Sequence, residues 1–228
     1  MKPKLVDFRQ EQEALRLSMR EGMLEAASRL LLEEGAAALT VRKVADAVNC
    51  STTLLYSIFG GKDGLSNALY LEGFARYQRE FPLYAAQRPD APVARGLDSV
   101  LLYAHYYHAF ARRYPAYYMV MFGDAIAGFI PPEASRVAAW ESFTPLIGEF
   151  QYCMRHGSIP ASSASAAARL LWAAMHGVIS LELKGFYLKQ GHADDLFQTA
   201  VNAVLYSLQH APHHAIQQAP PLSSKDLL

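Results

Sequence analysis

Apolar residues recur every three or four positions along most of this chain, and this spacing predicts amphipathic helices. Clusters of β-branched residues alternating with polar ones, which strands would require, do not occur in the sequence. The helices that the pattern predicts cover residues 12–34, 40–48, 51–57, 62–81, 93–113, 133–156, 163–189 and 194–210, with a short apolar segment at 116–122. The predicted fold class is therefore all-α.

Three prolines within residues 82–92 mark the clearest break between predicted domains. The sequence then divides into four parts: a mobile N-terminal arm over 1–15, a helical head over 16–81, a larger helical body over 82–211 and a flexible tail over 212–228. Pro145 lies inside one predicted body helix, and we expect it to kink that helix.

Composition and charge narrow the classes of function. Hydrophobic residues make up 52% of the 228 residues and charged residues 18%, which indicates a well-filled core. The net charge is zero, and residues 1–62 carry nine Lys and Arg against eight Asp and Glu. The chain is therefore no generic polyanion binder, and any affinity for nucleic acid depends on where individual charges lie.

The cysteines and the apolar segments predict a cellular compartment. Cys50 and Cys153 are too few for a disulfide framework; Cys50 is expected to be a small buried residue, with a redox switch as the alternative. Residues 1–12 lack the apolar run of a signal peptide. The longest uncharged apolar stretch, 170–181, is shorter than the roughly 20 residues of a membrane span. We expect a cytoplasmic protein without a membrane segment.

The most informative stretch is TVRKVADAVNCSTTLLYSIFGGKDGL at residues 40–65. Thr40 is suited to cap a short helix, and Ser51 is suited to cap a second one after a turn at Asn49 and Cys50. Two short helices joined by about three residues form a helix-turn-helix, whose second helix enters the major groove of DNA. The stretch therefore predicts a DNA-binding regulator.

The same stretch resembles the TetR/AcrR family of bacterial transcriptional repressors. The matching pieces are residues 40–45, residues 51–56 with Phe59, and residues 60–65, in the family's order and spacing. The resemblance covers about residues 18–75. It implies a three-helix DNA-binding head followed by a helical body that binds a ligand and dimerises.

The resemblance also implies which residues contact DNA. Thr52, Thr53 and Ser57 are expected to face bases, with ordinary capping and solvated surface as the alternative. Tyr56 is expected to contact a phosphate, and burial in the core is its alternative. The full predicted set is Thr40, Arg42, Lys43, Ser51, Thr52, Thr53, Tyr56, Ser57 and Lys62.

One departure from the family pattern weakens the predicted binding. Many relatives carry basic or imidazole side chains where this chain has Ser57 and Ile58. We expect contacts from the N-terminal arm, which carries Lys2, Lys4 and Arg9, to compensate for this loss.

The predicted body is rich in aromatic residues at helical spacing, which suits an apolar ligand site as well as a plain helical core. Trp172, His176 and Gly177 also resemble a C-terminal subtype of the family that carries Trp, His and Gly at this spacing. His176 faces either the ligand or the core. The predicted ligand-binding residues are Tyr103, Tyr107, Phe110, Met119, Phe122, Trp140, Phe143, Trp172, Met175 and His176.

The predicted helix at 163–189 is apolar nearly all round between Arg169 and Glu182, so both of its sides need cover. In the family the last two long helices pair with their copies from a second subunit. This implies a homodimer that buries Leu170, Ala174, Val178, Leu181, Ala200, Val201, Val204, Leu205 and Leu208.

The predicted function is a ligand-responsive dimeric repressor that binds a pseudo-palindromic double-stranded DNA operator and is released by a small apolar or aromatic effector. The alternatives are a small-molecule sensor that has lost DNA binding and a helical interaction protein without a ligand. Catalytic motifs such as HExxH, GxSxG and a Gly-rich phosphate loop are absent from the sequence, so we expect no enzyme, catalytic residue or cofactor. His105 and His108 lack an obvious third ligand, so no metal site is predicted.

Overall fold

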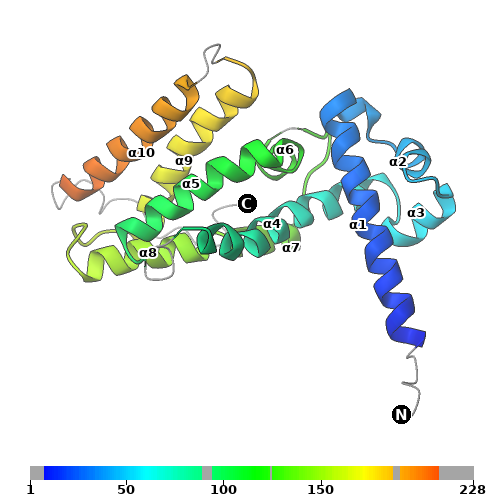
Figure 1. The fold of residues 1–228 in the computed structure, drawn as a ribbon, viewed down its shortest axis with the longest axis horizontal. Coiled ribbons are helices and arrows are strands. Elements are labelled where there is room, and N and C mark those ends of the chain that lie inside the picture. Colours follow the sequence, from blue (N-terminus) through cyan, green and yellow to red (C-terminus); the bar gives the residue numbers. More distant parts are fainter. Residues whose placement is uncertain (1–7, 89–93, 124, 187–190, 211–228) are drawn as a thin grey trace. The chain divides into compact units, whose positions relative to one another are not determined.

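The computed structural model describes residues 8–88, 94–123, 125–186 and 191–210. Within these ranges the chain forms ten α-helices and one short 3-10 helix, without a strand (Figure 1). The predicted all-α class is confirmed. The predicted tail at 212–228 lies outside the described residues.

The chain divides into two compact units, one of residues 1–73 with 116–132 and the other of residues 74–115 with 133–228. This division differs from the predicted boundary at 82–92, because α4 (Lys62–Ala86) continues through Pro82. Aromatic residues in the second half of α4 pack on the body. The ring of Phe81 stacks on that of Tyr103 with centroids 4.1 Å apart, and Tyr84 lies 5.0 Å from Tyr106.

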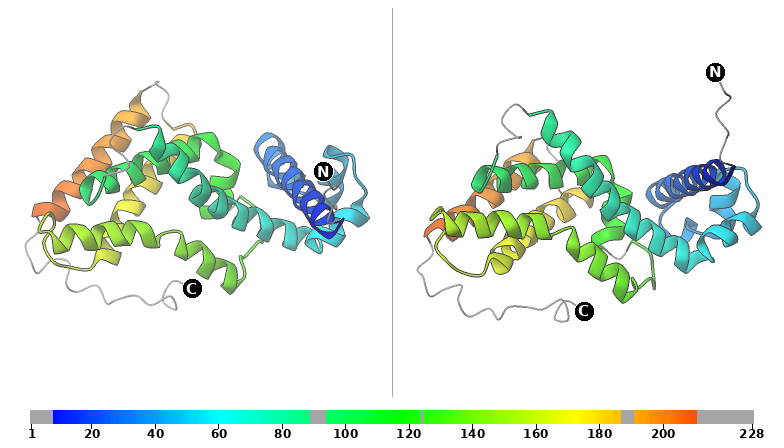
Figure 2. Two further views of the ribbon diagram at one scale, coloured as in Figure 1. Left: turned by 60° about the horizontal axis from the view of Figure 1, so that its bottom comes forward. Right: turned by 90° about the horizontal axis from the view of Figure 1, so that it is seen from below.

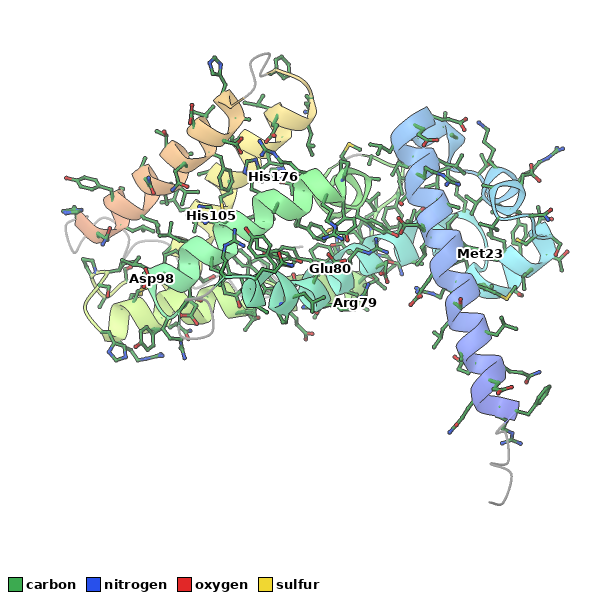
Figure 3. The ribbon with its side chains drawn as sticks, in the orientation of Figure 1. Met23, Arg79, Glu80, Asp98, His105 and His176 are labelled. Atoms are coloured by element: carbon green, nitrogen blue, oxygen red, sulfur yellow. The ribbon has the colours of Figure 1, made fainter. Side chains whose placement is uncertain are left out.

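The first unit is built on α1 (Phe8–Glu34), the 3-10 helix η1 (Ala36–Ala38), α2 (Val41–Ala47), α3 (Thr52–Phe59) and the start of α4, together with α6 (Pro115–Phe122). Met23, labelled on α1 in Figure 3, is 2% exposed. It belongs to an apolar core with Leu24, Ala27, Leu31, Val44, Ala45, Leu55, Leu65 and Leu69.

The N-terminal arm is shorter than predicted, because α1 begins at Phe8. Residues 9–15 consist of Arg, Gln, Glu, Ala and Leu, which all favour helix. All residues from Phe8 to Met19 are exposed, and Figure 1 shows the first turns of α1 extending beyond α2 and α3. Residues 1–7 lie outside the described residues.

The second unit contains α5 (Leu97–Arg113), α7 (Glu133–Glu141), α8 (Thr144–Arg155), α9 (Ala164–Leu183) and α10 (His192–His210). Helices α9 and α10 run antiparallel side by side, and α9 also packs on α8 and α5. Figure 2 shows these four helices together from two further sides.

The predicted helix over 133–156 is two helices. α7 ends at Glu141, where the amides of Ser142 and Phe143 donate to carbonyls three residues back. Pro145 then occupies the first turn of α8. Proline lacks an amide hydrogen and clashes with the carbonyl four residues before it, so it fits a helix start better than an interior. The expected kink at Pro145 is therefore a break.

Helix α9 is longer than the uncharged stretch at 170–181, because it begins at Ala164, before Arg169, and ends at Leu183, after Glu182. By length and composition alone, its 20 residues would be enough to cross a membrane. This is weak evidence, since core helices of soluble proteins have the same composition. In the second unit α9 packs on α5, α8 and α10.

Candidate functional site

Both short helices of the helix-turn-helix are capped as predicted. The Oγ1 of Thr40 accepts a hydrogen bond from the amide of Lys43 at 3.2 Å, and the Oγ of Ser51 accepts one from the amide of Leu54 at 3.2 Å. Both caps have extended backbone angles, as N-caps require. Between the helices Asn49 has φ +53°, a left-handed conformation that asparagine tolerates. These local contacts fix where α3 begins.

Glycines fix the end of α3 and its junction with α4. Gly60 is the left-handed C-cap of α3, and its amide donates to the carbonyl of Tyr56 at 2.8 Å. A Cβ on Gly64 would lie 1.7 Å from the carbonyl oxygen of Phe59. The first turn of α4 therefore packs directly on the backbone at the end of α3, which explains a glycine at position 64.

The outer face of α3 presents polar side chains to solvent. Thr52, Thr53 and Ser57 are exposed, and so is Tyr56, at 55%. The alternative that Tyr56 is a core residue is therefore excluded. The hydroxyl of Ser57 donates to the carbonyl of Leu54 at 2.7 Å, which leaves its oxygen free to accept a further hydrogen bond. This face carries donors and acceptors suited to base edges and phosphates.

The cations around the helix-turn-helix differ in their freedom to bind phosphate. Arg42 and Lys62 are exposed, at the starts of α2 and α4. The Nζ of Lys43 forms an ion pair with Glu34, near the end of α1. Part of its charge is thus neutralised within the protein. Arg9 is exposed on α1, whereas Lys2 and Lys4 lie outside the described residues.

In the second unit, half of the predicted ligand-binding residues form one aromatic cluster. The indole Nε1 of Trp172 donates to the hydroxyl of Tyr107 at 2.9 Å. Phe143 lies 6.0 Å from Trp172 and 5.0 Å from Trp140, measured between ring centroids. His176, labelled in Figure 3, follows one turn after Trp172 with centroids 5.9 Å apart. Burial and the nearby Lys184 lower the pKa of His176, so its ring is neutral near pH 7.

The other predicted ligand residues lie elsewhere. Tyr103 and Phe110 contact α4 through Phe81 and Tyr77, and Met175 is a buried core residue. Met119 and Phe122 lie on α6, in the first unit. The predicted ten residues are therefore not gathered by the contacts of the second unit alone.

The sequence did not lead us to predict two features of the body. Tyr77, Phe81 and Tyr84 of α4 pack among the aromatic rings of α5. Their spacing of four and three continues a helical stripe, a signal that the prolines of 82–92 obscured. Arg169 places its guanidinium carbon 4.8 Å from the centroid of Trp140. Its position one turn before Trp172 was the available signal.

The two histidines considered as metal ligands bind different partners. His105 Nε2 lies 2.9 Å from Gln198 Oε1, and His108 Nε2 lies 2.7 Å from Glu182 Oε2. In the described ranges no three His, Cys, Asp or Glu side chains are grouped to hold a metal ion. Cys50 is partly exposed rather than buried, and Cys153 is buried.

Family models match both parts of this arrangement. Residues 23–69 match the model for bacterial regulatory proteins of the tetR family, and residues 100–204 match a tetracyclin repressor-like C-terminal domain. The chain belongs to the TetR family. Proteins of this family are soluble DNA-binding transcription regulators rather than enzymes, bind small-molecule effectors and are usually dimers.

Solved structures share the fold. A protein of unknown function from Rhodococcus sp. RHA1 is 20% identical over 92% of this chain and 100% of its own, with a TM-score of 0.70. The protein SCO4313 is 24% identical over 85% of this chain and 98% of its own, with a TM-score of 0.68. The flavonoid-responsive regulator FrrA is 19% identical over 85% of this chain and 98% of its own, with a TM-score of 0.54. No match was found among the curated proteins.

Proposed function

We propose that this TetR-family chain is a cytoplasmic, homodimeric repressor that binds a pseudo-palindromic operator and is released by a small aromatic or apolar effector. The observation that carries the proposal is the exposed face of α3, where Thr52, Thr53, Tyr56 and Ser57 have no apolar cover. Capped and supported helices with a polar outward face are what major-groove recognition requires.

The role of each DNA-binding residue follows from its chemistry. Thr52 and Thr53 contact base edges or a thymine methyl, and Ser57 accepts from a base amino group. Tyr56, Arg42 and Lys62 contact phosphates, which position the head without reading sequence. Thr40 and Ser51 cap their helices and set the angle at which α3 enters the groove.

The aromatic cluster of the second unit is the proposed effector site. Aromatic walls with a few polar groups, here the Tyr107 hydroxyl and the His176 ring, suit a largely apolar ligand. FrrA, which shares the fold, is a flavonoid-responsive regulator. Effector binding is proposed to lower operator affinity by shifting the separation of the two heads, with a coupling free energy of about 1–3 kcal/mol.

A mobility-shift assay with the DNA upstream of the chain's own coding region tests this function. The wild-type protein is expected to shift that DNA, with an affinity that falls steeply as salt rises. Tyr56→Phe removes one phosphate contact, and Thr53→Ala removes one base contact, so both are expected to weaken binding. Ser158→Ala, which removes an exposed hydroxyl from the body, serves as the control.

The outcome distinguishes the candidate functions. Equal binding by wild type, Tyr56→Phe and Thr53→Ala would contradict the proposal that the exposed face of α3 contacts DNA. Salt-insensitive or absent binding to all DNA tested, with retained ligand binding, would favour the sensor without DNA binding.

A further inference from the structure

Two nitrogens of the partly exposed Arg169 guanidinium group have no acceptor among the described protein atoms. Its Nε and Nη2 atoms are buried and have no hydrogen-bond partner. A guanidinium group stays protonated in proteins, so it cannot escape this penalty by losing its proton. Buried donors of a charged group normally have a partner from protein, water or ligand, and a missing partner needs an explanation.

The surroundings of Arg169 are aromatic. Its guanidinium carbon lies 4.8 Å from the centroid of the Trp140 ring. Trp172 and His176 follow Arg169 at three and seven residues along α9, so the three side chains share one face of the helix. A cation over a ring gains attraction from the ring face, but that contact provides no acceptor for the N–H donors.

A second guanidinium group reinforces the positive charge. Arg136 stands one turn before Trp140 on α7, and its Nε is also buried without a hydrogen-bond partner. His176 adds no charge near neutral pH, because burial lowers its pKa. The positive charge beside Trp140 comes from these arginines, and Lys184 adds a further positive charge near His176.

We propose that the aromatic cluster binds an organic carboxylate with an apolar, aromatic body, and that Arg169 is its principal anion-binding residue. The proposal rests on the proposed function, in which this cluster holds the effector. A carboxylate offers two acceptors that match the donor fork of a guanidinium group. The rings of Trp140, Phe143 and Trp172 then pack on the apolar part of the ligand.

The chain itself supplies a probe for the test, because Trp140 and Trp172 are its two tryptophans. Full-length protein is titrated with benzoate, 4-phenylbutyrate and decanoate, each paired with its neutral amide, while tryptophan fluorescence is recorded. Acetate and inorganic phosphate test whether a small anion alone suffices. At least one aryl or alkyl carboxylate is expected to bind about tenfold or more tightly than its amide.

The variant Arg169→Gln is expected to remove that preference, weakening the carboxylate about tenfold while leaving the amide within about twofold. Arg155→Gln, at an exposed position on α8, is the matched control and should bind both probes as the wild type does. Thermal melting without ligand gives a second measurement. Arg169→Met is expected to melt at or above the wild-type temperature, since it removes two buried nitrogens that have no hydrogen-bond partner.

Several results would overturn the inference: no saturable fluorescence change with any carboxylate, equal binding of acid and amide, or an unchanged preference in Arg169→Gln. Acetate or phosphate binding as tightly as the aryl carboxylates would show a small-anion site instead. A lower melting temperature for Arg169→Met would indicate a structural role. Carboxylate binding that leaves the mobility shift unchanged would keep this inference and contradict effector-controlled repression.

Discussion

Lys43, a predicted DNA-contacting cation, is partly neutralised by an acidic residue of the same DNA-binding head. The side chain lies on α2, where a phosphate contact is expected, yet its ammonium group pairs with Glu34. Both partners are about half exposed, so the pair stabilises the fold little. Its greater effect is on binding, because a phosphate must compete with Glu34 for the same cation.

Glu34→Gln is therefore expected to tighten operator binding by up to about fivefold, the range of an exposed ion pair. Fluorescence anisotropy with labelled upstream DNA at two salt concentrations measures the change. Glu33→Gln is the matched control, since it alters net charge equally at an exposed neighbouring position. Equal tightening by the two variants would show that overall charge, and not release of Lys43, determines the affinity.

Among single residues, local chemistry was predicted better than burial. The caps at Thr40 and Ser51 follow from side-chain oxygens next to short apolar helices, and both are confirmed. The expected burial of Cys50 was wrong. The two unpartnered nitrogens of Arg169 were not predicted, because a missing hydrogen bond depends on tertiary neighbours rather than on sequence spacing.

The sequence predicted most of the helices, but their boundaries were wrong where the prediction relied on proline positions. Proline is unfavourable inside a helix, which made residues 82–92 look like a domain break. α4 nevertheless continues through Pro82, because the packing of Phe81 and Tyr84 on α5 outweighs the lost amide. At Pro145 the sequence predicted a kinked continuous helix, whereas α7 ends before this residue and α8 begins beside it.

The junction of α3 and α4 gives a test of how the recognition helix is held. Gly64→Ala places a Cβ against the Phe59 carbonyl, so the backbone must shift. We expect a loss of about 1–3 kcal/mol in the free energy of unfolding, as for overpacked sites. Urea denaturation followed by circular dichroism measures it, and operator affinity should fall as well.

Gly22→Ala is the matched control for this junction. Gly22 lies in the middle of α1, and an added Cβ there meets no atom within 4 Å. This variant is expected to gain up to about 1 kcal/mol from helix propensity alone. Similar stability changes in the two variants would contradict the close packing of α4 on α3.

Some residues predicted to lie in the dimer interface are already buried within a single chain. Val178, Val201, Leu205 and Leu208 lie inside the second unit and are not available to a partner. The large exposed apolar residues on α9 are Leu170 and Leu181, at 49% and 43%, with exposed Ala173 and Gly177 between them on the same face. On α10 the large exposed apolar residues are Leu196 and Tyr206. A second copy of α9 and α10 is the cover that this face is expected to have.

Leu181→Asp tests this face, because a buried carboxylate without a partner is strongly unfavourable at an interface. Light scattering at micromolar concentration should give a dimer for the wild type and a monomer for Leu181→Asp. Leu83→Asp is the matched control at an exposed leucine of α4 and should remain dimeric. Operator affinity should fall only in Leu181→Asp, since a monomer engages one half-site. A dimeric Leu181→Asp or a monomeric wild type would move the interface away from α9, and the control of head spacing by ligand would then need another structural route.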